Sequence, residues 1–398
     1  MHLLTPRGFR AGAAAAGIKS KQALDVGLLI CESPATSAAV FTTSRVVSPA
    51  VIIGRKHIAR GTLRGVVVNS GNANACTGRQ GLTDAVQMCK LAAKHLGCDP
   101  HLLLPSSTGI IGHHLPMGKI KNGIDSAYEY LGNSQEHALR FADAILTTDT
   151  RRKQAAVRVK IGGEKITIAG VCKGSGMIGP RLGLHATMLA YLTTDASISP
   201  ALLRKLVQQA ADGSFNAVTV DDHASTNDTA CVLASGASGA TIRSASDVAK
   251  FASALNEACQ SLAYQIAADG EGATKVVRID VTGASNVQAA RAIARSIANS
   301  PLVKCAMNGN DPNWGRIVSA AGYAGVPFDS EKSALKLQNT LVFRRGQPVA
   351  FNAGKVSKSL AAKEVRIELA CNLGKASATV WTCDLSKEYV TINADYHT

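Results

Sequence analysis

The sequence predicts a mixed α/β fold of the α+β type with antiparallel hairpins, because two kinds of pattern alternate along the chain. Apolar residues at every second position predict β-hairpins at residues 157–168 and 365–381. Apolar residues at helical spacing predict helices, most clearly at residues 247–268. A chain of 398 residues is too long for one ordinary core, so we expect about two or three domains.

The N-terminal half supplies the first strand and helix. An apolar run after Gly65 predicts a short strand that enters an Asn/Gly-rich loop. Thr83 is expected to cap the next helix, and Gly97 is expected to end it. The residue types in between follow a helical apolar period, so we expect one face of this helix to be buried.

The remaining elements follow from turn and cap residues. Gly162-Gly163 predicts the turn of the first hairpin. Pro200 predicts the first turn of a helix that ends near Gly213. Residues 372–375 are expected to turn the second hairpin, and a change of composition near 281 predicts a smaller C-terminal α/β subdomain, about 281–398.

Composition and charge favour a globular protein that handles small molecules. The formal net charge is +15, but the basic residues are dispersed and only 4% of residues are aromatic, which argues against nucleic-acid binding. No apolar run reaches the roughly 18 residues of a membrane span. Arg7 and Arg10 interrupt the N-terminal apolar stretch where a signal peptide requires continuity, so we expect a cytoplasmic protein. Ten scattered cysteines without a CxxC pair predict reduced thiols and no metal site.

A glycine pattern at residues 174–179, Gly-x-Gly-x-x-Gly, has the spacing of a dinucleotide-binding turn. Such a turn follows a buried parallel strand and opens directly into a helix. Here an alternating hairpin strand precedes it, and Pro180 and Gly183 follow it. A nucleotide-binding, non-enzymatic protein is therefore the weaker alternative.

The Ala186-Thr187 pair after this turn predicts a different chemistry. A threonine hydroxyl is a poor nucleophile unless a base lies beside it. Cleavage of the chain before Thr187 would supply that base, because the new α-amine has an intrinsic pKa of about 7.7–8. Such a site also needs hydrogen-bond donors for the oxyanion of each acyl intermediate.

Blocks along nearly the whole chain resemble the ornithine acetyltransferases of arginine biosynthesis, a self-processing family. The blocks share their residue types and their order with that family: GFRAGAAAAGIK, PATSAAVFTTSR, VVNSGNANACTG, SSTGIIG, TTDT, KGSGMI, ATMLA, STNDT, DGEGATK, DPNWGRI and INADYHT. The resemblance implies a layered αββα-like core. It also implies cleavage into an α chain, 1–186, and a β chain, 187–398, which assemble as α2β2.

The resemblance also implies the roles of individual residues. Thr187 is the expected nucleophile, and Thr108 and Gly109 match the oxyanion-hole pair. Five further positions match substrate-binding positions, in addition to Thr187 itself: Thr150, Lys173, Glu271, Asn393 and Thr398. By residue type, Lys173 suits a substrate carboxylate and Glu271 suits the ornithine ammonium. Trp314 and Arg316 are expected to pack.

The implied reaction transfers an acetyl group from N2-acetylornithine to glutamate through an acetyl-Thr187 intermediate, with no metal or organic cofactor. Some family members also accept acetyl-CoA, and the residues leave open whether this chain does. A self-processed amidase or aminopeptidase of related architecture, with water as the acceptor, is the alternative enzyme.

Two segments depart from the family pattern. Between Pro180 and Ala186 this chain has Arg-Leu-Gly-Leu-His at residues 181–185, three residues longer than the family's segment and without its Asn-Met pair, which bears on the efficiency of self-cleavage. The family commonly has Gly-Asp-Thr before the STND block, where this chain has Asp222-His223-Ala224. We expect a different local turn there and no catalytic residue.

Overall fold

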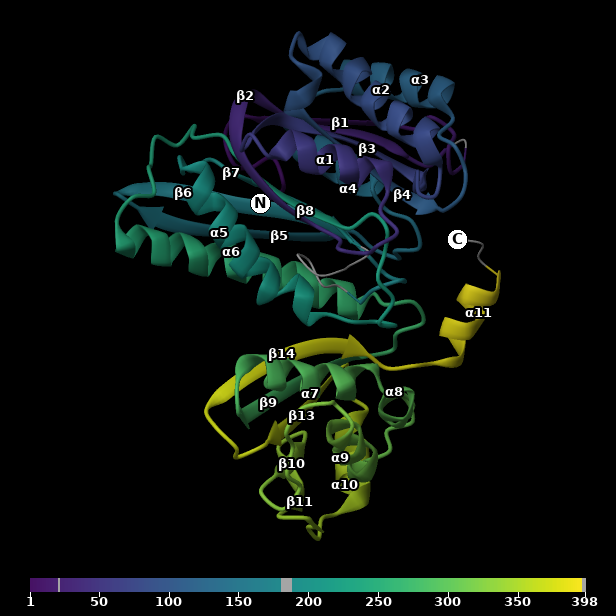
Figure 1. Ribbon diagram of the computed structural model, residues 1–398, viewed down its shortest axis with the longest axis vertical. Helices are drawn as coiled ribbons and strands as arrows, with labels where there is room; N and C mark the ends of the chain where they lie inside the picture. Colours follow the sequence, from purple (N-terminus) through teal and green to yellow (C-terminus); the bar gives the residue numbers. More distant parts are fainter. Residues whose placement is uncertain (21, 180–187, 396–398) are drawn as a thin grey trace. The chain divides into compact units, whose positions relative to one another are not determined.

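The computed structural model describes residues 1–20, 22–179 and 188–395. The chain divides into two compact units (Figure 1). Unit 1 comprises Met1–Asn216 and His223–Leu262. Unit 2 comprises Ala217–Asp222 and Ala263–His397, so it takes in strand residues ahead of the boundary near 281 that the sequence suggested. None of the helices in the described part of the chain is long and apolar enough to cross a membrane.

Unit 1 is built on an eight-stranded mixed sheet with the order β4-β3-β2-β8-β7-β6-β5, and β1 pairs with β2 beside that path. Parallel pairs join β3 to β4 and β7 to β8, while the other neighbours are antiparallel. The strands are β1 (Phe9–Ala14), β2 (Val26–Phe41), β3 (Thr62–Asn72), β4 (Leu103–Ile110), β5 (Lys153–Ile161), β6 (Glu164–Lys173), β7 (Leu189–Thr194) and β8 (Thr229–Ala234).

The long strand β2 bends the sheet into two layers. Its first part pairs with β1 and β3, its pairing with β3 shifts register between Ile30 and Ala35, and its last part pairs with β8. One apolar core joins side chains of the β2–β4 layer, such as Val66 and Val68, to Tyr191 and Leu233 of the β7–β8 layer. This core therefore lies between the two layers.

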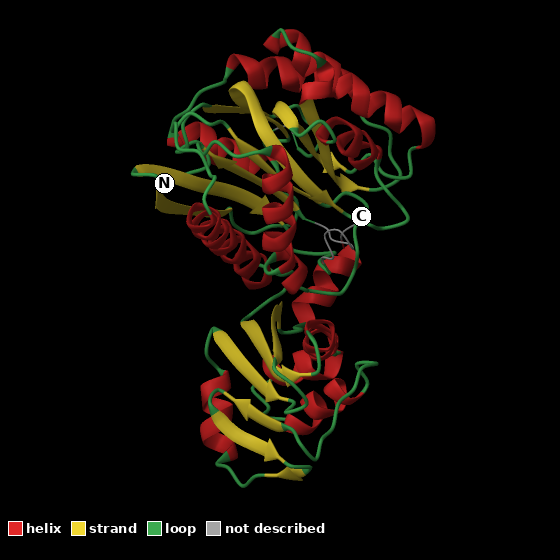
Figure 2. Ribbon diagram, turned by 60° about the vertical axis from the view of Figure 1, so that its left-hand side comes forward, coloured by secondary structure: helices red, strands yellow, loops and turns green. Residues whose placement is uncertain are grey.

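Helices cover the outer faces of both layers (Figure 2). Side chains of β2 and β3 that alternate with the inner ones, such as Leu28 and Val67, pack with Met88 of α2 and Ile124 of α3. This alternation is the period of two that a strand with two buried faces requires. On the opposite side, α5 and α6 lie along the β5–β8 layer (Figure 1). The predicted αββα-like layering is confirmed.

Unit 1 has the three helices that the sequence predicts, α2, α5 and α6, and three that it did not predict, α1, α3 and α4. They are α1 (Pro49–Ile58), α2 (Gly78–Leu96), α3 (Met117–Glu129), α4 (Gln135–Ala144), α5 (Pro200–Asp212) and α6 (Ala245–Ala268), the last of which continues into unit 2. Gly97 ends α2 in the left-handed conformation, φ 58°, as predicted. The predicted cap at Thr83 is wrong, because α2 begins five residues earlier and the Thr83 hydroxyl bonds the Arg79 carbonyl inside the helix.

Unit 2 has a six-stranded sheet with the order β12-β11-β10-β13-β9-β14. Helices α7, α8 and α9 pack on it around one apolar core. The strands are β9 (Val276–Ala284), β10 (Ala334–Leu337), β11 (Thr340–Arg344), β12 (Gln347–Pro348), β13 (Glu364–Ala370) and β14 (Ala376–Cys383). The helices are α7 (Val287–Asn299), α8 (Pro301–Asn308), α9 (Trp314–Gly322), α10 (Ala353–Leu360) and α11 (Lys387–Asp395).

The predicted hairpin at 365–381 is wrong, although both of its strands exist. β13 pairs in parallel with β9, and β14 pairs antiparallel with the other edge of β9. The intervening loop crosses the end of β9, where the amides of Leu373 and Gly374 donate to the Gly283 carbonyl. Apolar alternation identifies a strand but not its partner, and β9 is the more buried partner for both strands. The hairpin at 157–168 is confirmed, with Gly162 and Gly163 both at positive φ.

A buried carboxylate fastens the N-terminal segment to unit 1. Asp25 is fully buried, and its oxygens accept hydrogen bonds from the amides of Ala16, Ile18 and Lys19 at 2.6–3.2 Å. A buried amide that loses its acceptor keeps its desolvation cost. This single side chain therefore fixes the loop that carries Lys19.

We expect Asp25→Ala to lower the free energy of unfolding by about 3 kcal/mol, because three amides lose their acceptor. Chemical denaturation measures the change. Asp143→Ala is the control, since Asp143 forms only a partly exposed ion pair with Arg152, and its loss costs less than about 1 kcal/mol. Equal losses of unfolding free energy in the two variants would contradict the role of Asp25 in holding the N-terminal segment.

Candidate functional site

The predicted oxyanion pair lies near the end of β4, next to β3. Thr108 pairs with Ser70, and Gly109 pairs with Gly71. Gly109 has φ 129°, and a Cβ atom there would lie 2.3 Å from the Gly71 carbonyl carbon. Only glycine fits this position, so the requirement for Gly109 follows from the backbone alone.

Lys173 reaches the same point from the end of β6. It is 4% exposed, and its Nζ donates to Thr108 Oγ1 at 3.3 Å. An ammonium has only donors, so the Thr108 oxygen is the acceptor in this bond. The Thr108 hydroxyl hydrogen is thereby directed away from Lys173, where it can serve a developing oxyanion.

A buried carboxylate, Asp149, organises the positive charge around this point. Its Oδ1 accepts from Lys153 Nζ at 2.6 Å and from the Gly174 amide at 2.7 Å. The side chains of Asp149 and Lys153 are both fully buried. Burial alone would raise the pKa of Asp149, but the charges of Lys173 and Lys153 and the Gly174 amide hold that pKa below its usual range.

Lys19 is a third lysine whose charge interacts with those of Asp149 and Lys173. Lys19 donates from Nζ to the Leu146 carbonyl at 2.9 Å. Burial lowers the pKa of Lys19, while Asp25 and Asp149 raise it in part. Three lysines thus lie close to Asp149, and Asp25 and Asp143 partly offset the charge of Lys19. Thr150, the residue after Asp149, is exposed beside it.

Asparagine side chains support the backbone of the oxyanion strand. Ser107 Oγ donates to Asn69 Oδ1 at 2.7 Å, and Asn69 Nδ2 donates to the Asn72 carbonyl at 2.8 Å. Asn227 Nδ2 donates to the carbonyls of Ser107, at 2.8 Å, and Ala73, at 2.6 Å. All of these bonds are buried. The side chains of Asn69 and of Asn227, from the STNDT block, thus hold the backbone around Ser107.

The described chain resumes at Met188, the residue after the predicted nucleophile. The Thr229 amide donates to the Met188 carbonyl at 2.9 Å, which extends the parallel β7–β8 ladder by one residue. Leu189 then lies between Thr229 of β8 and Lys173 of β6. Ala186, Thr187 and the 181–185 insert fall outside the described residues, as does Thr398.

Two predicted substrate-binding residues come together in unit 2. Asn393 Nδ2, on α11, donates to Glu271 Oε2 at 2.8 Å, and Glu271 is 7% exposed. Tyr389, on the same helix, bonds Asp221 at 3.4 Å. Burial, then the charges of Asp221 and Glu271, raise the pKa of Tyr389. The C-terminal helix is therefore fastened to the Glu271 loop by polar contacts.

Two other unit 2 positions named in the sequence have structural roles. Trp314 stacks on Phe343 with ring centroids 5.3 Å apart, and Arg316 bonds the Leu302 carbonyl at 3.0 Å. Asp222 has φ 56°, the left-handed conformation that glycine adopts without strain, and its carboxylate pairs with Arg295 at 3.2 Å. The position thus keeps the backbone geometry that a glycine there would allow.

The glycine pattern at 174–179 does not form a nucleotide-binding turn. β6, which precedes it, has antiparallel neighbours on both edges, and residues 174–179 form no helix. β6 alternates in sequence but is not half exposed, since eight of its ten residues are buried. Gly174 instead contributes its amide to Asp149.

The sequence analysis missed Asp149, Lys153 and Asn227. Asp149 and Asn227 lie within quoted blocks, TTDT and STNDT, but nothing local marks them as buried. Lys153 reads as the polar end of an alternating strand. A buried Lys–Asp pair four residues apart becomes visible only when both side chains are placed.

An αββα sandwich with Thr108, Gly109 and Lys173 together at one end of its sheet suits an enzyme of acyl transfer, the class that the sequence predicts. The ArgJ family model matches residues 10–398. The arginine biosynthesis bifunctional protein ArgJ of Dehalococcoides mccartyi (strain CBDB1) is 46% identical over 400 residues, covering 100% of this chain and 97% of that protein.

Two solved structures are also similar. ArgJ from Bacillus halodurans has a TM-score of 0.50 and 39% identity, covering 52% of this chain and 98% of its own. Ornithine acetyltransferase from Mycobacterium tuberculosis, complexed with ornithine, has a TM-score of 0.42 and 34% identity, covering 46% and 95%. The chain belongs to the ArgJ family. The predicted enzyme class, an acetyltransferase of arginine biosynthesis, is confirmed.

We expect Gly109→Ala to lower the free energy of unfolding by about 3 kcal/mol or more, because the new methyl group overlaps the Gly71–Asn72 backbone. Gly112→Ala is the matched control. Gly112 also has positive φ, 88°, but open space around its Cβ position, so only about 1–2 kcal/mol of backbone strain applies. Chemical denaturation measures the unfolding free energy of both variants. Equal losses in Gly109→Ala and Gly112→Ala would contradict the close contact at Gly109.

Asp149→Asn tests whether the buried Asp149 carboxylate contributes a pH-dependent part of the stability. A depressed folded-state pKa stabilises the protein above the unfolded-state value, about 3.9, and this stabilisation is lost as pH falls through the folded-state pKa. We therefore expect the stability difference between wild type and variant to be constant above about pH 5 and to shrink below about pH 4. Asp143→Asn, in a partly exposed pair, is the control. A difference that stays constant down to pH 2 would contradict this account.

Proposed function

We propose that this chain transfers an acetyl group from N2-acetylornithine to glutamate through an acetyl ester on Thr187. The observation that carries the proposal is the Lys173–Thr108 hydrogen bond at 3.3 Å, next to Gly109. This bond orients the Thr108 hydroxyl, and the Gly109 amide lies beside it. Lys173 also pairs with Leu189, the first residue of β7, which follows Thr187 by two positions in the sequence. The hydroxyl and the amide are the donors that an acyl-transfer nucleophile needs.

The nucleophile becomes competent by self-cleavage between Ala186 and Thr187. The Thr187 hydroxyl attacks the Ala186 carbonyl, the peptide shifts to an ester, and water releases an α chain, 1–186, and a β chain, 187–398. Support comes from the solved Bacillus halodurans ArgJ chain, 98% of which matches only 52% of this chain, so it is about half as long. We further propose an α2β2 assembly in the cytoplasm.

The freed α-amine of Thr187 then acts as base and acid in turn. It takes the hydroxyl proton as Thr187 attacks the acetyl carbonyl, and it returns that proton to the ornithine amine as the amide bond breaks. Glutamate's amine attacks the ester in the second half. Thr108 and Gly109 stabilise the oxyanion in both halves, and Lys173 and Thr150 bind the substrate together with Glu271, Asn393 and Thr398.

Acetyl-CoA is a second acetyl donor in this proposal. The curated relatives are named bifunctional, which is the support for including it. Attack on a thioester breaks the carbon–sulfur bond, and the thiol leaves with the proton held by the α-amine. The same acetyl-Thr187 ester then serves glutamate, and no metal or organic cofactor takes part in any step.

The hydrolase alternative differs only in the acceptor. Acetylornithine is supplied with and without glutamate, and ornithine is measured. We expect ornithine release to require glutamate and to yield equal acetylglutamate. Ornithine release that is independent of glutamate would identify an amidase instead.

We expect purified wild-type protein to give two chains by intact mass spectrometry, with Thr187 at the new N-terminus. Thr187→Ala should give one inactive chain, because both the cleaving and the transferring hydroxyl are gone. Thr187→Ser, which keeps a hydroxyl, is the control and should still cleave. An uncleaved wild type with full activity would overturn the mechanism.

A further inference from the structure

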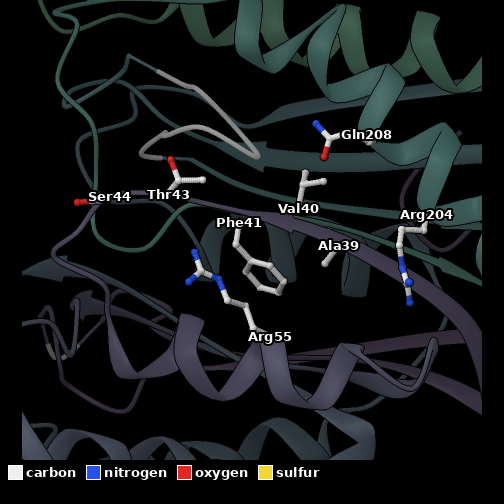
Figure 3. A pocket seen from close by; sticks show the side chains of 8 residues that line it. All are labelled: Ala39, Val40, Phe41, Thr43, Ser44, Arg55, Arg204 and Gln208. Carbon is white, nitrogen blue, oxygen red and sulfur yellow. The ribbon is translucent and has the colours of Figure 1, made fainter.

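A pocket of about 520 Å³ opens in unit 1 beside the end of β2 (Figure 3). Its size is that of a small-molecule or cofactor site. Arg55 reaches into it from α1, and Arg204 and Gln208 reach into it from α5. The described residues that line it are Ala39, Val40, Phe41, Thr43, Ser44, Arg55, Arg204 and Gln208.

Two arginines, Arg55 and Arg204, give the pocket its positive charge. Neither Arg55 nor Arg204 forms an ion pair with a carboxylate of the described residues, and none of the described lining residues is acidic. Arg55 Nη2 donates to the Thr42 carbonyl, which holds its guanidinium at the rim. Two guanidinium groups without a counter-charge suit phosphate groups, which they bind by paired N–H donors.

The wall of the pocket is an open strand edge. β3 pairs with β2 only as far as Thr36, and among the described strands the residues of β2 after Ser37 pair with β8 alone. The Ser37 amide donates to Gly61, on the β3 side, and the Thr42 amide donates to Asp228, on the β8 side. Because amides alternate along a strand, those of Ala39 and Phe41 point toward the open edge.

The open edge of β2 lies at the end of the sheet where β7 starts, and β7 starts two residues after the predicted nucleophile in the sequence. Phe41 pairs with Thr229, and Thr229 pairs with Leu189. Two strand spacings separate Phe41 from Leu189, which is about 10 Å. In Figure 3, Thr43 and Ser44 mark one end of the pocket and Arg204 marks the other, with Ala39 and Phe41 between them.

From these features we propose that the pocket binds the phosphate-bearing nucleotide and amide arm of acetyl-CoA. The arm's amide groups pair with the free edge of β2 at Ala39 and Phe41, as an added strand would. Arg55 and Arg204 bind the phosphates. The thioester end extends past Thr43 toward the start of β7. The inference rests on the proposed function, since it locates one of that reaction's two donors.

The two acetyl donors differ in whether they carry phosphate groups that the pocket would bind. N2-acetylornithine carries no phosphate and gains nothing from Arg55 or Arg204. Acetyl-CoA carries its recognition groups far from its reacting carbon, and binding energy from remote groups lowers the barrier at the reacting centre. Loss of both arginines should therefore impair one donor and spare the other.

The test uses Arg55→Gln/Arg204→Gln with Lys56→Gln/Lys205→Gln as the matched control. The control makes the same charge change on the same two helices, one residue away, at exposed lysines that do not line the pocket. Acetylglutamate is measured by mass spectrometry with either donor. We expect the arginine variant to raise KM for acetyl-CoA at least about tenfold, as lost charged hydrogen bonds do, and to change acetylornithine exchange less than about twofold.

Ala39→Pro tests the strand edge separately. Proline removes only the amide that faces the open side, and edge positions tolerate it. We expect KM for acetyl-CoA to rise while acetylornithine exchange is kept. Desulfo-CoA, which lacks the reacting sulfur, should inhibit wild type competitively against acetyl-CoA and should lose affinity in both pocket variants.

The outcomes separate the inference from the proposed function. The proposed acetyl-CoA site would be wrong if the arginine and lysine variants lost acetyl-CoA activity equally. It would also be wrong if KM for acetyl-CoA did not change in the arginine variant. Wild type that exchanges acetyl from acetylornithine but neither uses acetyl-CoA nor binds desulfo-CoA would overturn it too, while leaving the first donor in place. Wild type inactive with both donors would overturn the proposed function itself.

Discussion

The single constraint on which unit 1 depends is the course of β2. One 16-residue strand belongs to both layers, so the layers cannot shift independently. Its first part pairs with β3, which in turn pairs with β4, the strand of Thr108 and Gly109, and its last part pairs with β8, which pairs with β7. Because β3 leaves β2 at Thr36, the same bend also opens the strand edge beside Ala39 and Phe41. Site and pocket are thus two consequences of one strand.

Buried polar contacts fix the geometry around Thr108, Gly109 and Lys173 more closely than apolar packing does. Gly109 is set against Gly71 by backbone contact, and Asn227 ties the carbonyls of Ser107 and Ala73 together. Asp149 holds the Gly174 amide and so the end of β6, where Lys173 lies. A buried charge costs free energy unless it is paired, and Asp149 is paired with Lys153. Such a network favours one arrangement, since each member loses its partner if the others move.

Local sequence patterns predicted those features that depend on neighbours along the chain. The end of α2 at Gly97 and the Gly162-Gly163 turn follow from the backbone preference of glycine for positive φ. Partner choice depends on distant segments, so the alternation at 365–381 gave two correct strands and the wrong pairing.

The candidate site divides in the same way. Thr108, Gly109 and Lys173 came from their resemblance to family blocks, and the structure brings them together. Asp149 and Lys153 could not be predicted, because burial of a charged pair is a property of the packed molecule. Asp222 shows the converse limit, since an aspartate occupies a left-handed backbone that residue type alone assigns to glycine.

The excess of basic residues acquires a physical meaning from this arrangement. Both amino-acid substrates carry carboxylates and acetyl-CoA carries phosphates, so each must leave water for a site that compensates negative charge. Lys173 supplies positive charge beside Thr108, and Arg55 and Arg204, which form no ion pair within the described residues, supply it beside β2. The dispersed remainder of the +15 charge raises the local concentration of anions without forming a polyanion-binding surface. Affinity for anionic substrates then comes from the built clusters, and the overall charge contributes chiefly to the rate of encounter, which salt screens.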